Sequence, residues 1–162
     1  MLFDANLTAK AKQVLTTCGE KHMRVATAES CTGGLISALL TEIPGSSVVI
    51  GRSFVTYSNR AKHEILNVPA ELLQQHGAVS EEVVCAMAQN TFDMTSAHLT
   101  IAVSGIAGPG GGSAEKPAGT VHMATCTADG VHHIRQSFGD IGRTEVRLAT
   151  VDAAMDMLLA QL

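Results

Sequence analysis

Ser30 is the residue of this 162-residue chain best placed to act as a nucleophile. It lies in the stretch Thr27-Ala-Glu-Ser-Cys-Thr-Gly-Gly34, between an apolar run that ends at Ala28 and a helical pattern that begins near Leu35. A strand-to-helix turn leaves backbone N–H groups free at the helix start, and glycines let a negative charge come close to them. We therefore expect Thr32, Gly33 and Gly34 to contact the substrate and to hold a developing oxyanion.

Two alternatives remain open for this stretch. Ser30 could instead be the N-cap of the following helix, although a full capping box would have Glu or Gln where Gly33 stands. Cys31 is a second candidate nucleophile, because a thiol at a helix N-terminus can have a lowered pKa. No histidine in the stretch could serve as the base for Cys31, so it ranks below Ser30.

A base for Ser30 is expected at the strand-to-helix junction that Tyr57 and Lys62 flank. No G-x-S-x-G elbow occurs, and His63 is the only histidine near the expected site, which argues against a Ser-His-Asp triad. Lys62 could act as the base if burial and nearby helix N-termini lowered its pKa from about 10.4 by ~2–3 units. The alternative is an ordinary solvated lysine on a short helix.

The glycine-rich segment that begins at Ser104 could form one wall of the site. It is not a P-loop, because Gly111 and Gly112 stand where that motif has Lys and then Ser or Thr. The alternatives are a mobile connection and a wall that lets the backbone approach a planar or phosphorylated ligand. On the second interpretation, Ser104 and Gly105 bind the substrate.

The apolar periodicity predicts an α/β fold. We expect strands near residues 25–28, 47–57, 99–103, 121–127 and 131–138, and helices near residues 7–18, 35–40, 58–66, 70–76 and 144–159. A further helix should begin at Ser80, with its apolar stripe extending to Ala88. Strands that alternate with helices and end in a hairpin indicate a three-layer α/β/α sandwich over residues 1–162, as a single domain. Its mixed, mainly parallel sheet would be followed by a C-terminal β-hairpin and helix. The Ser30 turn, the Tyr57–Lys62 junction and the Ser104 loop would meet at the carboxyl ends of the strands.

The amino-acid composition of the chain limits the kinds of molecule that it is expected to bind. The net charge is −4, no run of Lys or Arg occurs and aromatic residues make up 3% of the chain, so nucleic acid and membranes are not expected partners. The four cysteines form no C-x-x-C pair and no signal segment is visible, which fits reduced thiols in the cytoplasm. The histidines lack the spacing of a metal site, and we expect neither a metal nor a cofactor.

Several separate motifs, in order, resemble the CinA C-terminal domain family. They are Ala28-Glu-Ser-Cys-Thr-Gly-Gly34, Val55-Thr-Tyr-Ser-Asn59 with Lys62, Gly77-Ala-Val-Ser-Glu81, and Val103-Ser-Gly-Ile-Ala-Gly-Pro109 with Lys116-Pro117. Standalone members are nicotinamide-nucleotide amidases, which hydrolyse the carboxamide of nicotinamide mononucleotide to nicotinate mononucleotide and ammonia. The resemblance implies a serine amidase with Ser30 and Lys62 as its catalytic pair and with Tyr57, close by, as a third catalytic residue. Two alternatives stay open: a non-catalytic nucleotide-binding module, and a serine amidase that acts on another small amide. We also expect a homo-oligomer, with a dimer as the simplest guess.

The chain departs from the family pattern just before the last helix. Family members read Gly-Asp-Arg there, whereas this chain reads Gly139-Asp-Ile-Gly-Arg143, so the position of Asp140 does not match. An arginine at a helix N-terminus opposes the helix dipole unless an anion is shared there. We therefore expect Arg143 to bind the substrate phosphate; the alternative is an ion pair with Asp140 or Glu145.

Overall fold

A five-stranded sheet forms the centre of the molecule, in a computed structural model that describes residues 3–162. Its strand order is β2-β1-β3-β4-β5, and the strands are β1 (Val25–Glu29), β2 (Ile50–Val55), β3 (Leu99–Gly105), β4 (Thr120–Thr127) and β5 (Gly130–Ser137). β1 pairs in parallel with β2 and β3, whereas β4 is antiparallel to both β3 and β5. Only β4 therefore runs against the other strands, and the predicted mixed sheet with a C-terminal hairpin is confirmed.

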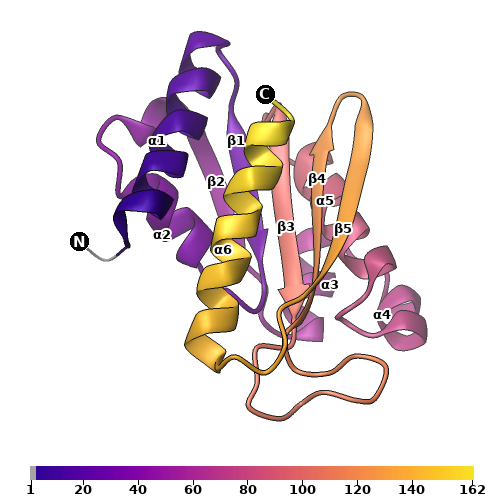
Figure 1. The fold of residues 1–162 in the computed structure, drawn as a ribbon. Coiled ribbons are helices and arrows are strands. Elements are labelled where there is room, and N and C mark those ends of the chain that lie inside the picture. The colour runs from indigo at the N-terminus through magenta and orange to yellow at the C-terminus, as the bar shows by residue number, and fades with distance from the viewer. Residues whose placement is uncertain (1–2) are drawn as a thin grey trace.

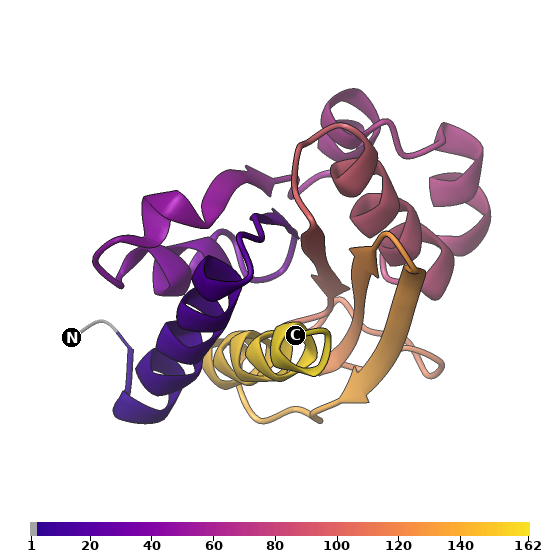
Figure 2. The ribbon, with the colours of Figure 1, turned by 90° about the horizontal axis from the view of Figure 1, so that it is seen from above.

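Helices cover both faces of the sheet, as Figures 1 and 2 show. The helices are α1 (Ala5–Glu20), α2 (Leu35–Thr41), α3 (Asn59–Leu66), α4 (Ala70–His76), α5 (Glu81–Asp93) and α6 (Arg143–Ala160). α1, α2 and α6 contribute to one apolar core, and α3, α4 and α5 contribute to the other. The side chains of β3 alternate between the two cores, with Ile101 and Val103 in the first and Ala102 in the second. The three-layer α/β/α architecture is confirmed.

One predicted strand is shorter than expected. The segment predicted as a strand over residues 47–57 begins with a single 3-10 turn, η1 (Ser46–Val48), and β2 follows only from Ile50 to Val55. The turn forms because Gly45, at φ +86°, accepts a hydrogen bond from the Val48 N–H at 3.2 Å. Residues 56–58 lie beyond the end of the strand, and the carbonyl groups of Thr56 and Tyr57 accept hydrogen bonds from a side chain.

The three parallel strands end at the same edge of the sheet. Ser30 follows β1, Tyr57 lies two residues beyond β2, and Ser104 and Gly105 are the last residues of β3. The expected convergence of three distant segments therefore follows directly from the strand directions. Within residues 3–162, no helix has both the length and the apolar character needed to span a membrane.

Candidate active site

Ser30 and Lys62 form a buried pair. Lys62 Nζ lies 2.9 Å from Ser30 Oγ, and it also donates hydrogen bonds to the backbone oxygens of Thr56 at 2.8 Å and Tyr57 at 3.5 Å. The lysine side chain is 1% exposed, and this burial lowers its pKa from 10.5 to about 8. An amine with such a pKa is partly neutral near physiological pH, so it can accept a proton.

The local sequence explains how α3 directs Lys62 inward. Ser58 is the N-cap, and its Oγ accepts a hydrogen bond from the Ala61 N–H at 3.0 Å. With the helix started there, Lys62 and Leu66 lie one turn apart on the same face, and both are buried. Lys62 thus occupies a position in the apolar stripe of α3. His63, the next residue, is exposed, and its Nδ1 lies 2.9 Å from the Val68 oxygen, so it is not part of this pair.

The interpretation of Ser30 as a helix N-cap is wrong. Gly34 is the N-cap of α2 and offers no side chain, and the carboxylate of Glu29 takes over the capping role. Glu29 is fully buried, and it accepts hydrogen bonds from Thr32 Oγ1 at 2.6 Å and from the N–H groups of Gly34, Ile36 and Ser37 at 3.1, 3.0 and 2.8 Å. A negative charge is favourable at a helix N-terminus, and here it leaves the Ser30 hydroxyl free for Lys62.

The turn after Ser30 does not present Thr32, Gly33 and Gly34 to the substrate as we expected. The Gly33 N–H donates to the Ser30 oxygen at 3.0 Å, and the Gly34 N–H and the Thr32 hydroxyl both bind Glu29. None of the three residues lines the adjacent cavity. The two glycines instead provide the turn geometry, with φ angles of +61° and +99°.

Cys31 contributes its backbone rather than its thiol to the cavity wall. Burial raises the pKa of the Cys31 thiol to about 12, so the thiolate is scarce at neutral pH and cannot compete as the nucleophile. Cys31 lines the cavity, and among residues 3–162 no oxygen accepts a hydrogen bond from its N–H, which lies beside the weakly accepting Cys31 thiol. Because the Ser30 carbonyl is bound inside the turn, the N–H of the same trans peptide points away from the turn. This group is the free donor nearest in sequence to Ser30.

The cavity beside the Ser30–Lys62 pair has a volume of about 350 Å³. Besides Ser30, Cys31 and Lys62, its walls are Tyr57, Ala78, Val79, Arg143 and residues 104–111. Both Ser104 and Gly105 line it. The Ser104 hydroxyl donates to the Ala78 oxygen at 2.7 Å, so it also fixes the neighbouring wall. Gly105 has no room for a side chain, since a Cβ there would lie 2.6 Å from Val121 Cγ2.

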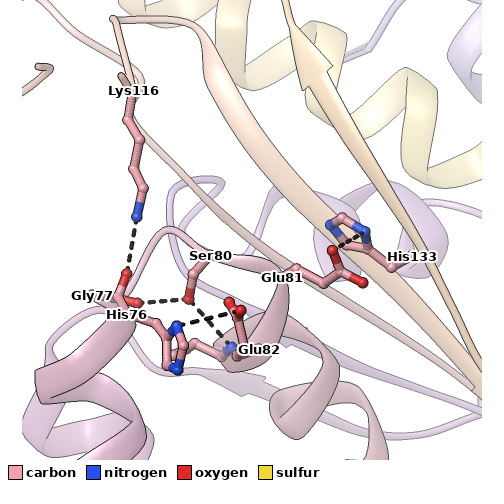
Figure 3. A network of polar contacts seen from close by, with 8 residues as sticks. His76, Gly77, Ser80, Glu81, Glu82, Lys116 and His133 are labelled. Atoms are coloured by element: carbon pink, nitrogen blue, oxygen red, sulfur yellow. Dashed lines mark hydrogen bonds and ion pairs between the residues drawn. The ribbon is translucent and has the colours of Figure 1, made fainter. Parts of the chain in front are cut away.

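The wall at Ala78 and Val79 is held by a polar network around the turn between α4 and α5. Lys116 Nζ donates to the His76 oxygen at 2.9 Å, and Ser80 Oγ donates to the Gly77 oxygen at 2.8 Å (Figure 3). Lys116 comes from the end of the glycine-rich segment, so this contact ties that segment to the α4–α5 turn. The polar residues of the network support the cavity wall without themselves lining the cavity.

Arg143 and Tyr57 meet at the mouth of the cavity. Arg143, the first residue of α6, donates to the Gly108 oxygen at 2.9 Å and to the Tyr57 hydroxyl at 2.8 Å. The alternative of an ion pair with Asp140 or Glu145 is wrong, because no carboxylate of residues 3–162 lies within 4.0 Å of its guanidinium. The cavity mouth therefore carries a positive charge without a negative partner in the described chain.

Arg147 is a residue that the sequence analysis missed. It lies one turn after Arg143 on α6, donates from Nε to the Cys31 oxygen at 3.1 Å and from Nη2 to the Thr32 oxygen at 2.9 Å. The only sequence signal is its spacing of four residues from Arg143, which places both arginines on one side of the helix. Its two contacts reach the turn that carries Ser30.

The fold and site define an α/β protein with a buried Ser–Lys pair at the carboxyl ends of its parallel strands. The family model of the CinA C-terminal domain matches residues 7–162, and the chain belongs to that family. This finding confirms the resemblance seen in the sequence.

The relatives agree with this assignment. A CinA-like protein of Parasynechococcus marenigrum is 47% identical over 153 residues, which cover 94% of this chain and 36% of the relative. The chain thus spans about a third of the length of such curated relatives. Among solved structures, a competence/damage inducible protein from Agrobacterium tumefaciens has 50% identity and a TM-score of 0.97, with 99% of this chain and 98% of the other covered. A CinA superfamily protein from Escherichia coli has 31% identity and a TM-score of 0.92, with 100% and 94% covered.

Proposed function

We propose that this protein is an amidase that hydrolyses the carboxamide of nicotinamide mononucleotide to nicotinate mononucleotide and ammonia through a Ser30 acyl-enzyme. The observation that carries the proposal is the buried amine of Lys62, 2.9 Å from Ser30 Oγ, with a pKa lowered to about 8 by burial. A serine hydroxyl is a weak nucleophile unless an adjacent base accepts its proton. In this proposal Lys62 is that base.

The hydrogen-bond partners of Lys62 favour the neutral amine as the base. A neutral amine has two N–H donors and one lone pair, whereas the backbone oxygens of Thr56 and Tyr57 can only accept hydrogen bonds. When both N–H groups bind these oxygens, the lone pair is left for the Ser30 hydroxyl. No salt bridge includes Lys62 among residues 3–162, so no carboxylate there holds it in the protonated form.

The reaction follows the usual two steps of acyl transfer. Lys62 takes the proton of the Ser30 hydroxyl as Oγ attacks the carboxamide carbon, and the negative charge moves to the carboxamide oxygen. The free N–H of Cys31 is the donor best placed to stabilise this oxyanion. The C–N bond then breaks, and the leaving amino group takes the proton from Lys62 and departs as ammonia. Water, deprotonated by Lys62, attacks the ester carbon, and the proton returns to Ser30 Oγ.

The groups at the cavity mouth favour a phosphorylated substrate. Arg143 lies there without a carboxylate partner, and Gly108, Gly110 and Gly111 have φ angles near +75°, a conformation that glycine adopts readily. Within residues 3–162, no acceptor binds the N–H groups of these three glycines. A guanidinium together with free backbone N–H groups suits a phosphate. The positive pyridinium ring of nicotinamide mononucleotide withdraws electrons from its own carboxamide, so the amide is already activated.

Ammonia release from nicotinamide mononucleotide tests the proposal, with Ser30→Ala as the blank. Release by the wild-type protein that is lost in Ser30→Ala supports the serine amidase. Binding of the nucleotide without release would favour a non-catalytic nucleotide-binding module. Release from other small amides, but not from this nucleotide, would favour an amidase of different specificity.

A further inference from the structure

We propose that Arg147 is a positioning residue, which holds the carbonyl groups of Cys31 and Thr32 and thereby sets the Ser30 turn in its reactive conformation. This inference rests on the proposed serine amidase function and goes beyond it, because Arg147 does not line the cavity. It would act on catalysis through the backbone of the turn alone.

The contacts of Arg147 fix two consecutive peptide groups. Nε lies 3.1 Å from the Cys31 oxygen and Nη2 lies 2.9 Å from the Thr32 oxygen. These donors belong to one rigid, planar guanidinium, so both carbonyls must keep a set relative orientation. The peptide between Cys31 and Thr32 is trans, and its N–H therefore points opposite to the carbonyl that Arg147 holds.

The turn is held from its other side by Glu29. The carboxylate binds N–H groups at and after Gly34, whereas Arg147 binds carbonyls before Gly34. The Ser30 N–H is bound as well, to the Val103 oxygen of β3 at 3.0 Å. Of the N–H groups from Ser30 to Gly34, only those of Cys31 and Thr32 have no oxygen acceptor in the described chain; both lie beside the weakly accepting Cys31 thiol. Contacts on both sides of the turn thus leave free a donor beside the nucleophile.

The charge of Arg147 supports the same role. No carboxylate of residues 3–162 lies within 4.0 Å of its guanidinium, and its hydrogen bonds within the described chain are those to the two carbonyls. Hydrogen bonds from a charged donor are stronger than neutral ones and hold their acceptors more firmly. A displacement of about 1 Å at a reacting group can lower a rate by about 100-fold. Loss of this contact should therefore lower kcat, and it should change the affinity for the substrate much less.

The test compares Arg147→Ala and Arg147→Lys with wild type on nicotinamide mononucleotide. Arg147→Ala should lower kcat by about 10- to 100-fold and leave KM within about threefold. Arg147→Lys keeps the charge, but its single amino group cannot hold both carbonyls in the fixed geometry of a guanidinium. Its kcat should therefore lie between the kcat of Arg147→Ala and that of the wild type. Full activity of Arg147→Lys would overturn the role of the two-pronged contact. Arg52→Ala is the matched control, because Arg52 also binds a backbone oxygen, that of Met94 at 3.2 Å, and lies outside the cavity.

Hydrogen exchange measures how firmly the backbone of the turn is held, and it needs no catalytic reaction. In the ligand-free protein, Arg147→Ala should speed exchange of the peptide that covers residues 31–34, and Arg52→Ala should not. If Arg147→Ala unfolds the protein, Arg147→Lys provides the same comparison. Unchanged exchange in a folded Arg147 variant, or unchanged kcat, would overturn the proposal.

Acetylation by p-nitrophenyl acetate separates this inference from the substrate assignment. The ester transfers its acetyl group to Ser30 and releases p-nitrophenolate, and Ser30→Ala is the blank. A Ser30-dependent burst that slows in Arg147→Ala supports the positioning role even if nicotinamide mononucleotide is not hydrolysed. A wild-type protein that shows neither the burst nor ammonia release would refute the serine amidase itself, and with it the role of Arg147 in catalysis.

Discussion

The two walls of the cavity are built in opposite ways. On the wall that carries the Ser30–Lys62 pair, the Lys62 side chain is 1% exposed and Ser30 is 7% exposed. Glu29, Arg147 and the backbone bind most of the polar groups around the pair, and the N–H groups of Cys31 and Thr32 are the exceptions in the described chain. On the wall that carries Tyr57, Arg143 and the glycine-rich segment, Tyr57 is 59% exposed and several glycine N–H groups have no acceptor in the described chain. One wall is closed and internally bonded, and the other is open.

This difference matches what each wall has to do. A base with a lowered pKa must be removed from water, and electrostatic interactions are stronger where water is excluded. A binding surface needs free donors and room for the ligand to enter. The two arginines of α6 repeat the contrast, because Arg147 holds the turn behind Ser30 while Arg143, one turn earlier, lies at the open mouth.

The largest effect should come from Ser30→Ala on the closed wall. The variant should lose at least about 1,000-fold in kcat, because the nucleophile is removed and no other group can replace it. The free energy of unfolding should change by only about 1 kcal/mol, since Glu29 and not Ser30 caps α2. Steady-state kinetics and urea unfolding check both statements. Retained turnover would show that the closed wall is not where the chemistry occurs.

The next largest effect concerns Lys62 and gives the pH dependence. Only neutral Lys62 can act as the base, and its neutral fraction grows as pH rises through its pKa of about 8. The kcat/KM of the wild type should therefore increase with pH and level off above that value. Lys62→Arg should lose about 100-fold or more, nearly as much as Lys62→Ala, because Arg stays protonated. Substantial activity of Lys62→Arg, or a rate that falls on the alkaline side, would instead indicate a charged stabiliser.

A smaller effect is expected on the open wall, from Arg143→Ala. Charge-assisted hydrogen bonds to a bound anion are worth about 1.5–3 kcal/mol, which corresponds to a KM about tenfold higher or more for nicotinamide mononucleotide. The KM for nicotinamide riboside, which lacks the phosphate, should change little. Measuring both substrates provides the control, and equal losses would remove Arg143 from the phosphate site.

The smallest effect should come from Tyr57→Phe. The Tyr57 hydroxyl accepts a hydrogen bond from Arg143 and lies at the exposed mouth, so its loss should raise KM by about threefold with little change in kcat. This outcome would assign Tyr57 a role in substrate binding on the open wall. A fall in kcat of about tenfold or more would mean that the hydroxyl takes part in the chemistry and that the two walls are less distinct.

The sequence by itself determined the order of the elements and the segments that meet at the site. Apolar periodicity, the hairpin signal at Asp129-Gly130 and the caps at Ser58 and Ser80 are local features, and the elements formed close to their predicted bounds. Once parallel strands were expected, the convergence of Ser30, Tyr57 and Ser104 followed from strand direction. The exception, Ser46–Val48, forms a 3-10 turn after Gly45, which adopts a positive φ that the β-rich composition does not reveal.

Only the tertiary structure decided which groups bind one another. The sequence did not indicate a role for Glu29, whose carboxylate caps α2. Gly33 and Gly34 shape the turn instead of facing the cavity. Arg143 binds Tyr57 and Gly108 rather than a nearby carboxylate, and Arg147 reaches a turn more than 100 residues earlier in the chain. The directions of N–H and C=O groups depend on backbone angles and on the packing of α6 against that turn. Residue types and spacing do not specify these quantities.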